Sequence, residues 1–149
     1  MRIRAAGYLA AAATLSAMAS ATPAAASHAP FGFDGIWRVT RIVGYSEVSV
    51  SPDRAHRLVG QTVTIGPRQL RIGDDDCVPD AMHADTRATA PVLLDRYHAG
   101  PADAGVPART LMLDAGQCGH VFRIGADIVV YQGGVFYRAS RVKPADKRR

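Results

Sequence analysis

The chain has 149 residues, of which 48% are hydrophobic and 21% charged, and its formal net charge is +5. This length supplies one domain with a substantial core and argues against two domains. The excess of basic residues lies at the two ends of the chain, and the body between them carries equal numbers of basic and acidic side chains. Such a balance argues against a nucleic-acid-binding surface.

Residues 1–26 have the pattern of a secretion signal. A basic start precedes an Ala-, Leu- and Met-rich run to about Ala19, and small residues suited to a signal peptidase follow. We expect cleavage after Ala26, with Ala21 as the alternative position. Because the apolar run is short and rich in Ala, it is a poor membrane anchor, and the mature protein is expected in a periplasm or outside the cell.

The rest of the chain is expected to form a single domain with short extensions. We expect a flexible N-terminus over residues 27–33, a barrel domain over 34–142 and a basic tail over 143–149. Two cysteines, Cys77 and Cys118, remain after signal removal. An oxidising compartment makes a disulfide between them the first expectation, and closing a loop of about 40 residues contributes ~4 kcal/mol in the chain-entropy view. A redox or metal pair is the alternative, although no C-x-x-C motif supports it.

The first predicted elements are a strand and a short helix. Residues 35–45 alternate in polarity and are rich in β-branched side chains, which predicts a strand, but both of its faces carry apolar and basic residues. Ser51 can cap a helix whose first position is Pro52, and Gly60 ends it. Two helical turns need support from other elements, and we expect this helix at the mouth of a barrel.

The middle of the chain is harder to interpret. Residues 61–66 and 69–73 are predicted strands joined by a tight turn, and Asp74 to Asp76 are predicted to form a solvated loop because they lack the alternation of a calcium loop. Residues 78–108 show little periodicity. A strand over 84–90 and a short helix over 91–98 are the elements they suggest, and a lid or an irregular loop is the alternative.

The last forty residues give the clearest pattern. Four apolar runs over residues 109–114, 118–124, 127–132 and 135–142 are separated by short Gly-containing connections, which predicts an antiparallel meander. With the earlier strands the total is seven or eight. Because closure removes exposed edges, we predict an all-β, antiparallel up-and-down β-barrel of about eight strands with one or two short helices. A sandwich is the competing architecture.

One motif resembles a known family. Gly35-Ile36-Trp37 is similar to the G-x-W motif of lipocalins and related calycin barrels. A wider set of features resembles small secreted lipocalin-like bacterial proteins. These features are Gly35 to Val39, Leu58-Val59-Gly60, Cys77 with Cys118, and Gly134 to Tyr137. The resemblance implies that Trp37 closes one end of the barrel and packs against an Arg of the last strand, either Arg141 or, as second choice, Arg138.

Few residues suggest chemistry. The five histidines stand at no metal-ligand spacing, so no metal and no cofactor are expected. His120 alternates with Cys118 and Phe122, which favours a structural role over a ligand or acid–base role. His83 and Asp85 form a possible acid–base pair only if one pocket holds both. Three tyrosines that can direct a hydroxyl group into a cavity complete the candidate ligand site with His120: Tyr45, Tyr97 and Tyr131.

These observations favour a non-enzymatic binding protein for a small apolar or amphipathic molecule. Two alternatives stay open: an inhibitor or interaction protein for a secreted enzyme, and a small barrel isomerase or lyase that uses His120 or His83 with Asp85. Neither nucleic acid nor stable membrane insertion is expected, whereas a protein partner is possible. The closed end at Trp37 directs the search for a site to the other end, near the helix after Ser51 and the loops from Cys77 to Pro107.

Overall fold

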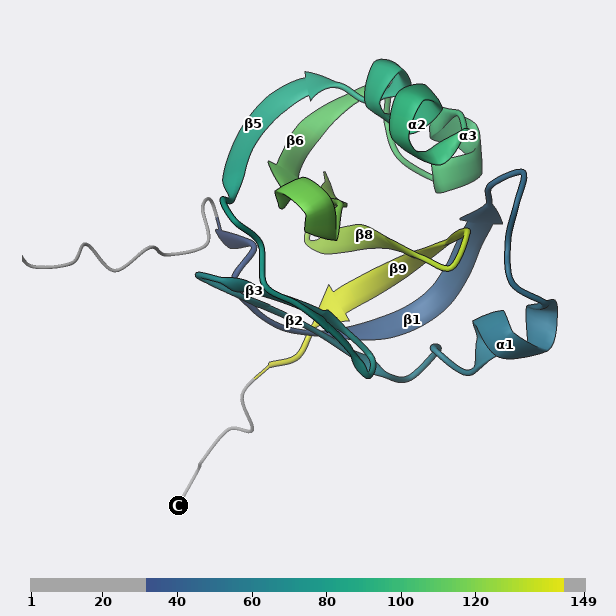
Figure 1. Ribbon diagram of the computed structural model, residues 1–149, viewed down its shortest axis with the longest axis horizontal. Helices are drawn as coiled ribbons and strands as arrows, with labels where there is room; N and C mark the ends of the chain where they lie inside the picture. The colour runs from purple at the N-terminus through teal and green to yellow at the C-terminus, as the bar shows by residue number, and fades with distance from the viewer. Residues whose placement is uncertain (1–31, 144–149) are drawn as a thin grey trace, which may run out of the picture.

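The computed structural model describes residues 32–143, which fold into one antiparallel sheet of nine strands that curls into a half-barrel (Figure 1). The strands are β1 (Gly35–Tyr45), β2 (Thr62–Gly66), β3 (Gln69–Ile72), β4 (Asp75–Cys77), β5 (His83–Ala88), β6 (Arg109–Asp114), β7 (His120–Ile124), β8 (Asp127–Gln132) and β9 (Val135–Arg141). The helices are α1 (Pro52–His56), α2 (Ala90–Tyr97), α3 (Pro101–Ala104) and the 3₁₀ turn η2 (Gly116–Cys118). The expected signal, its cleavage sites and nearly all of the basic tail lie outside the described residues.

The strand order explains the curl. Across the sheet it is β4-β3-β2-β1-β9-β8-β7-β6-β5, so every strand lies beside its neighbour in the chain except β4 and β5, and the first strand pairs with the last. The sheet is therefore an up-and-down meander with a single opening, between β4 and β5. The prediction of an all-β antiparallel, barrel-like fold with a few short helices is confirmed.

The number of strands differs from the prediction at the three consecutive aspartates. Asp75 and Asp76 are exposed, as expected, but they pair with Ile72 and Arg71 and form the edge strand β4. The expectation of a loop there was wrong, because the register of β3 continues through a tight turn at Gly73 and leaves both carboxylates in solvent. The ninth strand arises in this way.

Residues 78–108 are more regular than their sequence suggests. β5 and α2 lie close to the strand and the helix expected there, and α3 is an additional short helix. A strand was also expected from Cys118, but β7 begins only at His120, because η2 precedes it and Gly119 turns the chain at a φ of 97°. α2 and α3 lie together beside β6 and the end of β1 (Figure 1).

The two faces of the sheet carry separate cores. The inner face is filled by apolar side chains from both halves of the chain, among them Val39, Val63, Leu113 and Val130, all buried. The outer face of β6 to β9 packs against α2 and α3 through a second cluster that includes Leu93, Phe122 and Phe136. The helices thus cover the convex side and leave the mouth of the half-barrel to α1.

Trp37 fills one end of the half-barrel, where β1 meets β9. Its side chain is fully buried, and its indole N–H donates to the carbonyl of Phe33 over 2.9 Å. The guanidinium carbon of Arg141 lies 4.2 Å from the Trp37 ring centroid, and that of Arg123 lies 5.5 Å away. Arg138 does not share this contact, because its Nε donates to Asp127 over 2.7 Å on the outer face. Cations above an aromatic face stabilise by roughly 0.5–2 kcal/mol.

The folded part of the chain begins at this end of the half-barrel, at a lower residue number than predicted. Phe33, assigned from sequence to a flexible N-terminal segment, is fully buried, and the Arg123 guanidinium lies 4.7 Å from its ring centroid. Arg141 donates to the carbonyls of Gly32 and Asp34. The folded domain therefore begins before residue 34, because the two arginines that cover Trp37 also bind the backbone in front of it.

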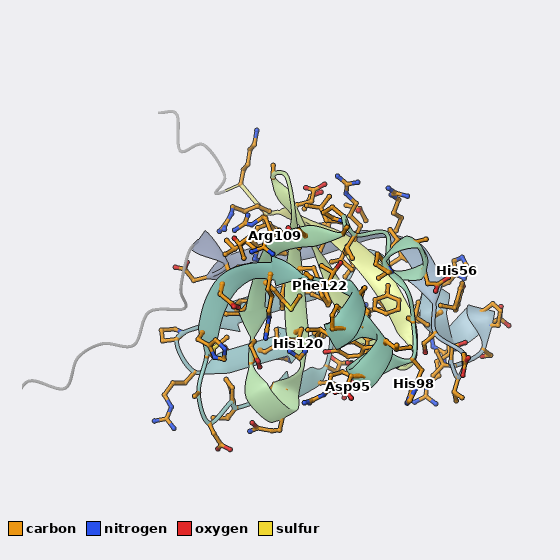
Figure 2. The ribbon with its side chains drawn as sticks, turned by 90° about the horizontal axis from the view of Figure 1, so that it is seen from above. His56, Asp95, His98, Arg109, His120 and Phe122 are labelled. Atoms are coloured by element: carbon orange, nitrogen blue, oxygen red, sulfur yellow. A yellow bond between two sulfur atoms is a disulfide. The ribbon has the colours of Figure 1, made fainter. Side chains whose placement is uncertain are left out.

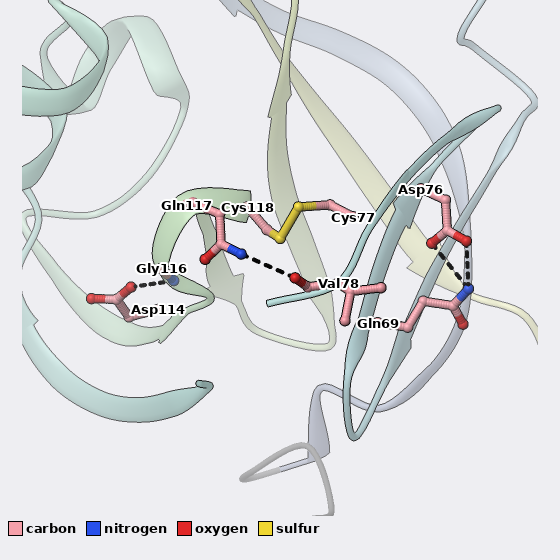
Figure 3. The surroundings of a disulfide bond; sticks show 8 residues. All are labelled: Gln69, Asp76, Cys77, Val78, Asp114, Gly116, Gln117 and Cys118. Atoms are coloured by element: carbon pink, nitrogen blue, oxygen red, sulfur yellow. Dashed lines mark hydrogen bonds between the residues drawn. A yellow bond between two sulfur atoms is a disulfide. The ribbon is translucent and has the colours of Figure 1, made fainter. Parts of the chain in front are cut away.

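A disulfide ties the edge strand β4 to the turn between β6 and β7 (Figure 3). Cys77 on β4 is bonded to Cys118 of η2, 41 residues away, with a Cα–Cα distance of 5.8 Å. Next to it, the Gln117 side-chain amide donates to the carbonyl of Val78 over 3.0 Å. These two links hold β4 against the turn before β7, although no backbone ladder connects the two edges.

Candidate functional site

Three of the four candidate ligand residues lie together on the outer face, under α2. The Tyr97 hydroxyl group is 2.8 Å from His120 Nδ1, and the rings of Tyr97 and Tyr131 are 4.5 Å apart. Figure 2 shows His120 and Phe122 side by side on the sheet, with His98 beyond the end of α2 and His56 on the far side of the molecule. The fourth residue, Tyr45, does not contact the other three.

The hydrogen bonds around His120 link α2 to the sheet. The backbone N–H of His120 donates to the Tyr97 hydroxyl oxygen over 2.9 Å, so the hydroxyl hydrogen is free to point at Nδ1. With Nδ1 as the acceptor, the ring proton lies on Nε2, which is 3.5 Å from Asp114 Oδ2. The lowered pKa of His120 favours this neutral form, in which the ring bridges a tyrosine on α2 to a carboxylate on β6.

Burial and neighbouring charges shift the ionisation of all three groups. Burial raises the pKa of Tyr97 to about 12. Burial also lowers the pKa of His120, and the nearby carboxylate of Asp114 opposes this lowering only in part. Burial alone would raise the pKa of Asp114, but the Gly116 N–H, His120 and Arg87 together hold it below its ordinary value. At neutral pH the network thus contains a neutral phenol, a neutral imidazole and a carboxylate.

The network continues to the surface through β5. His83, Asp114 and His120 stand directly opposite one another across β5, β6 and β7. Asp114 Oδ2 lies 3.3 Å from Arg87 Nη2 and 3.8 Å from His83 Nε2. Asp85 instead faces Arg87, with 3.4 Å between Asp85 Oδ1 and Arg87 Nε. His83 and Asp85 therefore have different partners and do not form a pair with each other.

This network holds α2 on the sheet. Tyr97 and His120 are both buried, and neither lines either of the two clefts described below. Their polar atoms are bonded to each other and to Asp114, so the hydrogen-bonding capacity of Tyr97 and His120 is used within the protein. This arrangement has a structural role, because it satisfies buried polar groups between a helix and a sheet.

The larger cleft lies at the barrel mouth, opposite the Trp37 end, and has a volume of about 610 Å³. We call it the mouth cleft. Its floor consists of Ile72 and Tyr137, both buried, and its apolar sides of Val50 and Leu58, both partly buried. Beneath the floor the barrel interior is packed with side chains. The mouth cleft is thus a depression over a filled core.

The local sequence builds the mouth cleft in two steps. The segment before α1 crosses the β8–β9 turn, where Ser46 and Val50 donate their backbone N–H groups to Gly134 and Gly133, each over 2.9 Å. A Cβ at Gly134 would stand 2.1 Å from the carbonyl oxygen of Val48, so this crossing requires glycine. The Tyr137 hydroxyl group then donates to the carbonyl of Ala55 over 3.1 Å and holds α1 above β9.

Charged side chains form the rim of the mouth cleft. Arg54 and Arg57, three residues apart on and just after α1, lie on one side and are both exposed. Among residues 32–143, neither has an acidic partner within ion-pair distance. Asp74 and Asp75, at the β3–β4 turn, line the same cleft, and Asp75 accepts a hydrogen bond from Gln132. The mouth cleft thus carries both cationic and anionic groups around an apolar floor.

Tyr45 belongs to a second cleft of about 530 Å³, between the end of β1 and the two helices of the outer face. Leu94, His98 and Asp103 also line it, and Leu94 is 68% exposed. Tyr45 is thus separated from the other three candidates, because β1 ends at the helices while β7 and β8 run beneath them.

Sequence reasoning did not single out Arg54 and Arg57. The available signal was their spacing, since residues three apart share one side of a helix that was itself expected at a barrel mouth. Within the described part of the chain, no group of three His, Cys, Asp or Glu side chains is placed to hold a metal ion. None of the helices between residues 32 and 143 is long and apolar enough to cross a bilayer.

Comparisons of the chain with protein-family models, curated proteins and solved structures find no match. The site is therefore judged on its own geometry. By that measure the mouth cleft is the better candidate for a ligand, because it combines room, an apolar floor and charged groups free to bind.

Proposed function

We propose that this protein is a secreted or periplasmic, lipocalin-like binding protein that holds a small amphipathic molecule in the mouth cleft without chemically changing it. The observation that carries the proposal is the juxtaposition of Arg54 and Arg57 with an apolar floor in a cleft of about 610 Å³. Ligand pockets commonly combine these features at volumes of roughly 300–1,000 Å³. The G-x-W resemblance supports the lipocalin-like class. The Cys77–Cys118 disulfide suits an oxidising compartment and so supports the secreted or periplasmic location.

The charges on the rim indicate the class of ligand. An anionic head group would pair with Arg54 and Arg57, while an apolar chain would cover Leu58, Ile72 and Tyr137. Because the core beneath the floor is packed, the chain would lie along the cleft rather than enter the barrel. A carboxylate with a short or medium-length alkyl chain meets these requirements, and Asp74 in the same cleft disfavours a second anionic group.

Calorimetric titration of the mature protein with decanoate and with decanol tests this proposal. Decanoate is expected to bind more tightly, because only it offers a charge to the arginines. An exposed ion pair contributes roughly 0.2–1 kcal/mol, so Arg54→Gln and Arg57→Gln should each weaken decanoate binding by up to about five-fold and leave decanol binding unchanged. Arg68→Gln, in the exposed β2–β3 turn, is the matched control and should bind as the wild type does.

Equal affinity for the two compounds, or unchanged decanoate binding after both arginine substitutions, would contradict the proposed ligand class. Native mass spectrometry of protein purified from its own host gives an independent readout. It should reveal a bound small molecule that is lost from the Arg54→Gln/Arg57→Gln double variant.

A further inference from the structure

The two edges of the open sheet differ in how they are protected. β4 is three residues long and carries the exposed carboxylates of Asp75 and Asp76, a short and charged edge of the kind that discourages pairing with other strands. β5 has six residues in unbroken register with β6 and contains neither proline nor a bulge. It forms the outer rim of the sheet in Figure 1. Only β5 is therefore available as an edge for strand pairing.

The direction of the free backbone groups on β5 follows from one hydrogen bond. Thr89 N–H donates to the carbonyl of Ala108 over 3.0 Å, in continuation of the β5–β6 register. Antiparallel pairs alternate between bonded and non-bonded positions, so Asp85 and Arg87 bond to β6 while the backbone groups of Thr86 point outward. The Arg109 guanidinium donates to the Thr86 carbonyl over 3.2 Å, which agrees with this phase, and Arg109 has to move aside when a second strand pairs at Thr86.

The sequence of β5 is complementary to itself. In an antiparallel pair of two β5 strands centred on Thr86, each Thr86 faces its equivalent, each Ala84 faces Ala88, and each Asp85 faces Arg87. The Asp85–Arg87 positions are the non-bonded ones, where side chains come closest and opposite charges stabilise the pair. Within one copy Arg87 already lies 3.4 Å from Asp85 and 3.3 Å from Asp114, so pairing exchanges the Asp85 contact between the copies. An antiparallel pair of two β4 strands would instead place carboxylates of the two copies close together. Charge complementarity thus selects a second copy of this chain as the partner of β5.

We propose that β5 is a homodimerisation edge, at which two copies pair antiparallel around a twofold axis at Thr86. The backbone groups of Ala84, Thr86 and Ala88 form the new ladder, two Asp85–Arg87 pairs flank it, and the two sheets become continuous. This surface is separate from the mouth cleft, so dimerisation and ligand binding can be tested independently. A single strand pair belongs to the small class of interfaces, below about 1,200 Å², and the dimer is accordingly concentration-dependent.

Sedimentation velocity of the mature protein from about 10 µM to 1 mM, the range that covers weak complexes, should show a monomer shifting to a dimer. Asp85→Lys places like charges opposite each other and should weaken the dimer at least about ten-fold. Thr86→Pro removes the N–H group on the twofold axis, which β6 does not use, and should abolish the dimer. The control is Asp76→Lys on β4, which should leave the dimer constant unchanged.

A cysteine pair tests the register itself. Thr86→Cys should form a disulfide-linked dimer under mild oxidation, since each Thr86 faces its own copy. Ala88→Cys should not, because Ala88 faces Ala84 and two Ala88 residues lie about four residues apart along the ladder. A monomer at every concentration, a dimer that survives Asp85→Lys with unchanged affinity, or equal cross-linking at both positions would overturn the proposal.

Discussion

At the scale of single residues, the closed end depends on the absence of a side chain as much as on Trp37. Gly35 has a φ of +130°, and a Cβ built on it would stand 2.5 Å from Arg141 Nη1. The glycine of the G-x-W motif thus leaves room for the arginine that covers the indole ring. The resemblance to G-x-W barrels implies this contact with Arg141 or, as second choice, Arg138, and the β1–β9 register places Arg141 opposite Trp37.

Gly35→Ala is therefore expected to lower the free energy of unfolding by about 1–3 kcal/mol, because it forces a strained backbone and displaces Arg141. Denaturant unfolding monitored by Trp37 fluorescence measures the loss. Gly66→Ala, where the added Cβ meets only an ordinary contact at 3.7 Å, is the matched control and should stay within about 0.5 kcal/mol of wild type. Equal effects of the two substitutions would contradict the steric argument.

His120 makes the free energy of unfolding depend on pH in the mildly acidic range. Its pKa in the folded protein lies below the ordinary value of 6.5, so in that range the unfolded chain binds more protons. Stability then falls as the pH drops below about 6.5. The contribution of Asp114, whose pKa is also lowered, is lost only at more acidic pH. The charged or titratable groups facing His120 are Tyr97 and Arg96 from α2, Asp114 from β6, and Arg87 and His83 from β5.

His120→Gln removes the titrating ring, so the loss of stability between about pH 7.5 and pH 5 should be smaller in this variant than in the wild type. Chemical unfolding at both pH values gives the comparison. All other titrating groups remain present in both proteins, and the difference between the two pH responses isolates His120. Identical pH responses would show that His120 does not titrate differently on folding.

At the scale of elements, α2 illustrates how a helix of eight residues is stabilised by what it covers. Leu93 and Tyr97, one turn apart, are its buried residues, and Tyr97 adds the bonds to His120. Ala99 and Val106 extend the same apolar cluster beyond the helix. A short helix with one apolar face is unstable alone, so the contacts with β7 and β8 determine its position.

Tyr97→Phe keeps the ring but leaves the His120 N–H and Nδ1 without their partner. Leaving buried polar groups unsatisfied costs about 1–3 kcal/mol, and faster hydrogen exchange in α2 should accompany the loss of stability. Tyr45→Phe is the control, because Tyr45 is 39% exposed and lies in the other cleft; it should change stability by less than about 0.5 kcal/mol. If both variants behave alike, the hydroxyl group of Tyr97 has no special role.

Some elements of the fold were predicted well from the sequence, and others were missed. The strands at Arg109–Asp114 and Asp127–Gln132 were predicted to the residue, because apolar runs there stop at glycine-containing turns. β4 was missed because three aspartates have a low strand propensity, which neighbouring β3 overrides. α3 was missed because four residues carry no helical period.

The candidate site was predictable only in part. The sequence indicated the mouth beside α1 as the place to search, and the mouth cleft lies there, but residue type alone selected the tyrosines, and alternation with Cys118 and Phe122 selected His120. Tyr97 and His120 are 23 residues apart and meet only because α2 folds back over β7. Contacts of that kind depend on the packing of a helix on a sheet, which a periodic pattern does not encode.

At the scale of the whole molecule, the opening between β4 and β5 makes the disulfide a substitute for a missing ladder. Every other neighbouring pair of strands shares backbone hydrogen bonds. At the opening, the Cys77–Cys118 bond and the Gln117 contact with Val78 instead connect the β4 edge to η2, the turn between β6 and β7. Loss of the disulfide is therefore expected to loosen the edges of the half-barrel more than its centre.

The double variant Cys77→Ser/Cys118→Ser should lose about 4 kcal/mol of stability, the chain-entropy value for a loop of this length. Hydrogen exchange should rise most in β4 and in the η2 turn and least in β1 and β9. The reduced wild-type protein should match the variant, which separates loss of the bond from the effect of serine. A uniform rise in exchange would show that the disulfide stabilises the sheet as a whole and not its opening.

The pairing of β1 with β9 has a consequence for the order in which the fold is completed. Trp37 lies between Val63 of β2 and Arg141 of β9, so one of its two flanking strands is the last to be synthesised. A chain that emerges N-terminus first can form the β1–β4 meander early, but its only tryptophan stays uncovered on one side until residue 141 arrives. Burial of that indole ring on both sides thus reports that β9 has joined the sheet.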